Sequence, residues 1–81
     1  MILPLVGIED VFTGFGTPRA VTNLESAKRD FKLLDNDDPR HGDLRLYHLG
    51  EFDTETGEIK AKKKPELLMK GEPKHENTLD S

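Results

Sequence analysis

The residues best suited to chemistry are lysines clustered in the last third of the chain: Lys60, Lys62, Lys63, Lys64 and Lys70. The first four place four ammonium groups within five residues. Ammonium groups at this spacing neutralise phosphates and release their counterions, so the run predicts contact with a nucleic-acid backbone. A solvated segment that only keeps the protein in solution is the alternative interpretation.

Three residues nearer the N-terminus are candidates for further contacts with nucleic acid. Arg45 and Tyr47 are two residues apart in an alternating segment, so they lie on the same face of a strand. A tyrosine beside an arginine is suited to stacking an unpaired base. Arg19 is expected near them if the strands pair in the order that the sequence suggests. A packed tyrosine beside a surface arginine is the alternative.

Other chemically active residue types do not form recognisable sites. The acidic cluster after residue 34 lacks the frame of a calcium-binding loop, because Pro39 and Arg40 interrupt it. The three histidines are far apart and lack the spacing of a zinc site. The segment with Gly14 and Gly16 lacks the third glycine and the lysine of a phosphate-binding loop. His48 is expected to be a partly covered strand residue. We therefore expect no catalytic residue, no metal, no cofactor and no enzymatic activity.

Length and composition limit the class of protein. A chain of 81 residues, 33% of them hydrophobic, has room for one small domain and not for a large enzyme fold. The absence of cysteine excludes a disulfide framework and thiolate metal sites, which favours a cytoplasmic protein. The apolar N-terminal run is interrupted by Pro4 and Gly7, so neither a signal peptide nor a membrane span is expected.

Charge divides the chain into unequal parts. Residues 1–59 carry −6, residues 60–74 carry +4 and residues 75–81 carry −2, which together give the net charge of −4. Most hydrophobic residues lie in the first part. The sequence therefore predicts a folded domain over residues 1–60 and a lysine-rich, mobile C-terminal tail over residues 61–81.

Hydrophobic periodicity predicts a small α+β domain. Strands are expected over residues 2–8, 19–21 and 44–49, with a connection over residues 13–18. A helix is expected to begin at Thr22 or Asn23 and to end at the polar segment 35–39. Residues 53–57 have the composition of a tight turn, with residues 58–60 returning as the second arm of a hairpin. The expected architecture is a mostly antiparallel sheet of three or four strands with one helix packed on a face.

The order of several short motifs resembles a known family. The motifs are FGTP at residues 15–18, AKRDF at 27–31, LYHLGEFD at 46–53 and TGEI at 56–59. Over residues 1–60 the chain resembles the small non-structural protein, often labelled DNA-binding, of gokushovirus-type microviruses, which are single-stranded DNA bacteriophages. The resemblance implies a protein of the host bacterial cytoplasm that binds single-stranded DNA or the replication complex and promotes viral genome synthesis and packaging.

A second function is compatible with the same sequence. The acidic body, or the apolar segment Leu67-Leu68-Met69, could bind a phage or host protein without any nucleic-acid contact. In either case the core is thin for a chain of this size, so pairing of two copies into a homodimer would stabilise the fold.

Overall fold

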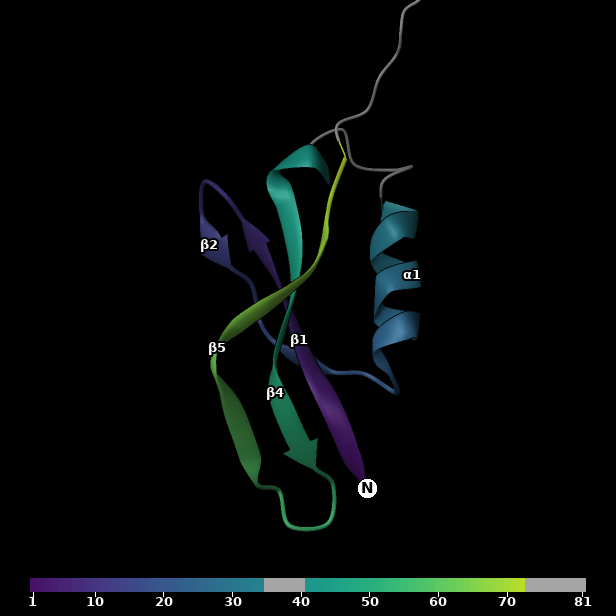
Figure 1. The fold of residues 1–81 in the computed structure, drawn as a ribbon, viewed down its shortest axis with the longest axis vertical. Coiled ribbons are helices and arrows are strands. Elements are labelled where there is room, and N and C mark those ends of the chain that lie inside the picture. The colour runs from purple at the N-terminus through teal and green to yellow at the C-terminus, as the bar shows by residue number, and fades with distance from the viewer. Residues whose placement is uncertain (35–40, 73–81) are drawn as a thin grey trace, which may run out of the picture.

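The fold is an antiparallel sheet with a single helix on one face (Figure 1). The computed structural model describes residues 1–34 and 41–72. Its elements are β1 (Ile2–Asp10), β2 (Gly14–Phe15), β3 (Arg19–Ala20), α1 (Leu24–Leu34), the 3₁₀ turn η1 (His41–Asp43), β4 (Leu44–Asp53) and β5 (Ile59–Lys70). The predicted fold class is confirmed. The expected helix-ending segment at residues 35–39 lies outside the described residues.

The sheet is organised around the long antiparallel pair β1 and β4. Its order is β2-β1-β4-β5, and β3 also pairs with β1. Both short strands lie along the outer edge of β1, β2 near Asp10 and β3 near Leu5. Pro4 suits this edge, because its carbonyl accepts from the Val21 N–H on the outer side and its missing N–H therefore costs no bond to β4.

The hydrophobic core lies between α1 and the sheet. Val6 of β1, Leu46 of β4, and Ala27 and Phe31 of α1 are buried. The helix has apolar residues at three- and four-residue spacing, so one stripe faces the sheet while its charged residues remain in solvent. Residues that complete the core are partly buried: Ile8, Val21, Leu24, Leu44, Leu68 and Met69.

Asn23, one of the two residues predicted to begin the helix, caps its first turn. The Asn23 side-chain oxygen accepts a hydrogen bond from the Ser26 N–H at 2.8 Å, and the Asn23 carbonyl accepts from the Ala27 N–H at 3.3 Å. Asn23 thus satisfies a backbone donor that has no partner within the helix.

Replacing Asn23 by alanine is expected to lower the free energy of unfolding by about 1 kcal/mol, the usual cost of losing such a cap. Urea denaturation followed by circular dichroism measures this change. Thr22→Ala is the matched control and should change stability by less than about 0.5 kcal/mol. A larger loss at Thr22 than at Asn23 would contradict the capping assignment.

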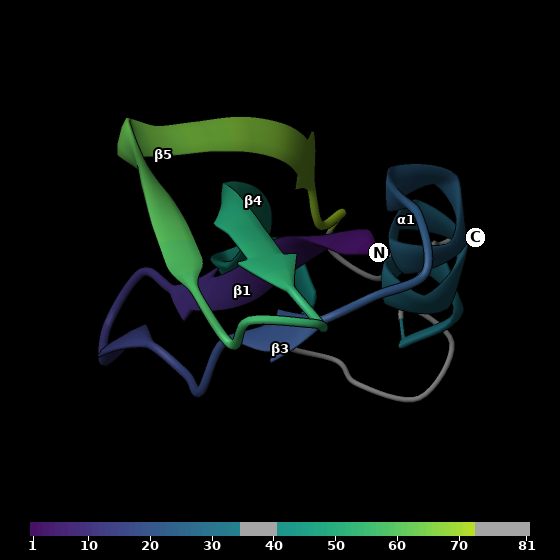
Figure 2. The ribbon, with the colours of Figure 1, turned by 90° about the horizontal axis from the view of Figure 1, so that it is seen from below.

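Strand β5 corrects the expectation that the chain leaves the fold at residue 60. Residues 59–70 pair antiparallel with β4, from Phe52↔Ile59 to Arg45↔Lys70. Near the middle, residues 62–65 form a bulge opposite Leu49, and Figure 2 shows β5 bending there into two arms. The lysine-rich composition indicated a mobile tail, but strand pairing uses backbone groups and does not depend on side-chain charge. In addition, Leu68 and Met69 add apolar contacts to the core. Residues 73–81 of the predicted tail lie outside the described residues.

The turn between β4 and β5 follows the predicted pattern. One Asp53 carboxylate oxygen accepts hydrogen bonds from the N–H groups of Glu55 at 2.9 Å and Thr56 at 3.4 Å. The bond from Glu55 is the main cause that lowers the pKa of the Asp53 carboxyl below its usual value. Gly57 adopts a φ of 78°, which a glycine takes without steric cost.

Candidate nucleic-acid interface

The face of the sheet opposite α1 has two adjacent rows of side chains near the end of the sheet where β1 and β5 finish and β4 begins. Residues directly opposite each other in antiparallel strands share a face. The register therefore places Phe15, Glu9, Arg45 and Lys70 in one row, and Gly7, Tyr47 and Leu67 in the next. We call this surface, defined by these residues, the open face.

Two aromatic rings form the centre of the open face. The ring centroids of Phe15 and Tyr47 are 5.3 Å apart with an interplanar angle of 56°. Phe15 is 46% exposed, so its ring is accessible to a ligand. The Leu49 side chain lies over Gly7 beside the rings, since a Cβ at residue 7 would come within 2.7 Å of Leu49 Cδ1 and 3.6 Å of a Phe15 ring carbon. Tyr47 is partly buried, and an aromatic pair with one exposed ring can stack bases of any sequence.

Two cations lie beside the rings. Arg45 and Lys70 are directly opposite each other on β4 and β5, in the same row as Phe15. Neither makes an ion pair with another residue in the part of the chain that the structure describes. Glu9 lies opposite Arg45 and partly offsets the positive potential. The row is therefore cationic on the β4 and β5 side and acidic at β1.

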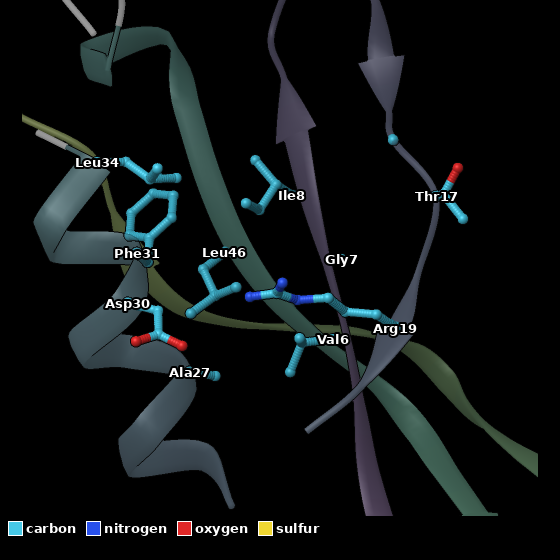
Figure 3. A pocket seen from close by; sticks show the side chains of 11 residues that line it. Val6, Gly7, Ile8, Thr17, Arg19, Ala27, Asp30, Phe31, Leu34 and Leu46 are labelled. Carbon is cyan, nitrogen blue, oxygen red and sulfur yellow. The ribbon is translucent and has the colours of Figure 1, made fainter. Parts of the chain in front are cut away.

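The three residues predicted to contact nucleic acid outside the lysine cluster separate into two groups. Arg45 and Tyr47 share the open face, as the alternation predicted. Arg19 does not join them, because it pairs with Val6, whose side chain is in the core on the helix side. Arg19 instead lines a cleft between α1 and β1, seen in Figure 3. The expected grouping of these three residues is thus wrong for Arg19.

The predicted lysines differ in their surroundings. Lys60 lines a hollow together with the acidic residues Glu51, Asp53 and Glu58. Lys62 makes an ion pair with Glu66 at 3.4 Å. Lys63 and Lys64 lie at the bend of β5, are exposed, and make no ion pair with any residue in the described ranges. Among the five predicted lysines, Lys63, Lys64 and Lys70 therefore have the most available charge.

Sequence reasoning missed four residues of the open face, Gly7, Glu9, Phe15 and Leu67, of which Phe15 and Leu67 add exposed apolar side chains. Phe15 lies between two glycines, within the connection predicted over residues 13–18. It is instead half of the two-residue strand β2, paired with Glu9. Leu67 was assigned to the tail, yet it lies opposite Tyr47 and is 43% exposed. A hairpin that pairs residue 15 with residue 9 would have placed Phe15 on this face.

His48 is the partly covered strand residue that its position predicted. Its side chain is 13% exposed, and its Nε2 donates to the Gly50 carbonyl at 3.0 Å. Nδ1 lies 3.8 Å from the Glu66 carboxylate. Within residues 1–34 and 41–72, no three His, Asp or Glu side chains are grouped so that they could hold a metal ion. The same ranges contain no helix with the length and hydropathy to cross a membrane.

The fold and the open face define a class of protein, a small α+β domain whose antiparallel sheet is covered by a helix on one side and presents exposed aromatic and cationic residues on the other. The family model of the Phage ORF5 protein matches residues 3–73, and the chain therefore belongs to this family of bacteriophage proteins. Comparisons with curated proteins and with solved structures each gave no match.

Proposed function

We propose that this phage protein binds single-stranded DNA through the open face, without catalysing a reaction. The observation that carries the proposal is the Phe15–Tyr47 pair, with Phe15 exposed and Tyr47 partly buried, beside Arg45 and Lys70, which make no ion pair within residues 1–34 and 41–72. In this role the protein promotes viral genome synthesis and packaging. The resemblance of residues 1–60 to the non-structural protein of microviruses supports that setting.

The chemistry of the open face favours a single strand over a duplex. Aromatic rings stack on bases only when the bases are unpaired and splayed out, and each stacked base contributes about 1–3 kcal/mol. The adjacent guanidinium and ammonium groups are placed for the phosphates that link such bases. A duplex hides its bases between two strands, so only the phosphate contacts would remain.

The negative net charge determines what kind of binding to expect. At −4 the whole molecule does not attract DNA from a distance, so long-range steering is weak. Binding depends on the local cations Arg45, Lys63, Lys64 and Lys70 and on stacking. We therefore expect an interaction that is sensitive to salt yet keeps a component that salt does not remove.

The dependence on salt tests the electrostatic part of the proposal. Four phosphate contacts give a slope of log K against log[salt] of about −3 for a single strand. The double variant Lys63→Ala/Lys64→Ala should reduce the magnitude of this slope by about 1.4, since each lost contact removes about 0.7. Fluorescence anisotropy of a labelled oligonucleotide, titrated with the full chain at several salt concentrations, gives both slopes.

A matched pair of lysines provides the control. Lys60→Ala/Lys62→Ala removes the same charge from β5, but these lysines lie beside carboxylates. Their loss should change the slope by less than half as much. An equal effect of the two double variants would indicate diffuse electrostatics and not a defined set of contacts.

A protein-interaction module is the second candidate, and a specific surface favours it. Val11 and Phe12, at the tip between β1 and β2, are 43% and 75% exposed. In the other segment proposed for a protein partner, Leu68 and Met69 pack against the core and only Leu67 is available. Failure of the full chain to bind single-stranded DNA at low salt would overturn our proposal and favour this alternative.

A further inference from the structure

A cleft of about 350 Å³ lies on the helix side of the sheet, away from the open face. Its floor is apolar and consists of Val6, Ala27, Phe31 and Leu46. This volume is at the low end of the range of about 300–1,000 Å³ for small-ligand pockets, so the cleft suits one flat ring system and not a peptide.

Two side chains of opposite charge face each other across this cleft. In Figure 3 the Arg19 side chain extends from β3 across the cleft toward α1, and the Asp30 carboxylate lies on the side of α1 that faces the sheet. Neither makes an ion pair or hydrogen bond with another residue among those the structure describes. Arg19 therefore offers a planar set of donors, and Asp30 a pair of acceptor oxygens, on opposite sides of an apolar floor.

We propose that this cleft binds a guanine base, with Asp30 accepting from the N1–H and N2–H₂ groups and Arg19 donating to O6 and N7. One flat face of the base would lie against the apolar lining of the cleft. The base could belong to a free nucleotide or to single-stranded DNA, and in the second case the inference rests on the proposed function.

Hydrogen-bond complementarity distinguishes guanine from the other bases. Guanine alone presents two adjacent donors to a carboxylate and, on a neighbouring edge, two acceptors to a guanidinium. Thymine has a single ring donor between two carbonyl oxygens, which repel a carboxylate. Adenine and cytosine offer a single exocyclic amino group as donor, so half of the carboxylate would stay unpaired.

The first experiment compares two oligonucleotides with the full chain. One is a thymidine-only strand of about 20 nucleotides, longer than the ~4–16 nucleotides that a small single-strand-binding domain covers. The other carries one central dG. We expect the dG strand to bind about tenfold tighter, the lower range for a good bidentate base contact. Asp30→Asn should abolish this preference and leave the affinity for the thymidine strand unchanged.

Altered bases assign each contact to its residue. Replacing dG by 7-deaza-dG removes N7, the acceptor assigned to Arg19, and replacing it by inosine removes the N2 amino group assigned to Asp30. In Arg19→Met the loss caused by 7-deaza-dG should disappear, and in Asp30→Asn the loss caused by inosine should disappear. Glu25→Gln and Arg29→Met are the controls, because these residues lie on α1 but do not line the cleft.

A third arm separates the two sources of the base and the two proposals. Binding of dGMP, compared with dAMP and TMP, is followed by NMR chemical shifts without any DNA present. Selective dGMP binding that Asp30→Asn abolishes supports the cleft even if the thymidine strand does not bind, a result that would overturn the proposed function alone. Binding of the thymidine strand without preference for dG, and without selective dGMP binding, would overturn the guanine site alone. Absence of all three signals would overturn both.

Discussion

Replacing Phe15 and Tyr47 together by alanine is expected to weaken binding of single-stranded DNA by about 30-fold or more, because two stacking surfaces of at least ~1 kcal/mol each are lost. The two rings lie 5.3 Å apart on the open face, so they act on the same or neighbouring bases. Anisotropy titration of a thymidine-only strand at one fixed salt concentration measures the loss. The dependence on salt should stay at its wild-type slope, since neither substitution removes a charge.

Two further variants make this prediction specific. Tyr47→Phe keeps a stacking ring and should bind nearly as well as the unaltered protein. Phe12→Ala removes an aromatic ring that is 75% exposed but lies at the tip between β1 and β2, outside the open face. It should leave binding unchanged. If Phe12→Ala weakened binding as much as the loss of Phe15 and Tyr47, the DNA contact would lie at the tip and not on the open face.

The parts of the fold that local signals determine could be predicted from the sequence. The helix has a capping residue at Asn23 and an apolar stripe that includes Ala27 and Phe31, and both features act within a few residues. The hairpin after β4 likewise depends on Asp53 and Gly57, which are close in the chain. Such short-range structure can be predicted from the sequence, because the residues that form the pattern are also the residues that make the contacts.

The path of β5 could not be predicted in the same way. Its pairing with β4 contains two register shifts, one of them a bulge that absorbs residues 62–65. No local pattern specifies such a bulge, and a run of lysines on a strand is typical of a solvated edge as well as of a tail. Leu68 and Met69 pack against the core only because β5 pairs with β4, so their role could not be predicted without that pairing.

The candidate site was predicted in part for a related reason. Arg45 and Tyr47 share a face because alternation along one strand is local. Placing Arg19 or Phe15 relative to them requires the register between strands, and a shift of one residue reverses the face of every side chain. The observed register pairs Arg19 with Val6 and Phe15 with Glu9, so Arg19 lies on the helix side and Phe15 on the open face.

Replacing Gly50 by alanine is expected to lower the free energy of unfolding by about 3 kcal/mol, the upper end of the usual cost of overpacking a buried position. Gly50 is buried where β4 passes the first arm of β5, opposite Ala61. A Cβ there would collide with the Lys60 carbonyl oxygen and come within 2.9 Å of the Ala61 Cα. Both are backbone atoms, so no side-chain rotation relieves the collision and the strands must separate. Urea denaturation measures the loss.

Gly16→Ala is the matched control for this prediction. The nearest atom to a Cβ at residue 16 is the Ile8 carbonyl oxygen at 3.8 Å, an ordinary contact distance. The substitution should therefore change stability by less than about 0.5 kcal/mol, as at most surface positions. Equal stabilities of the two variants would show that β5 does not pack against Gly50 as described. In that case the first arm of β5, with Lys60 and Lys62 to Lys64, would be free of the sheet, and its lysines would act as the tail that composition alone predicted.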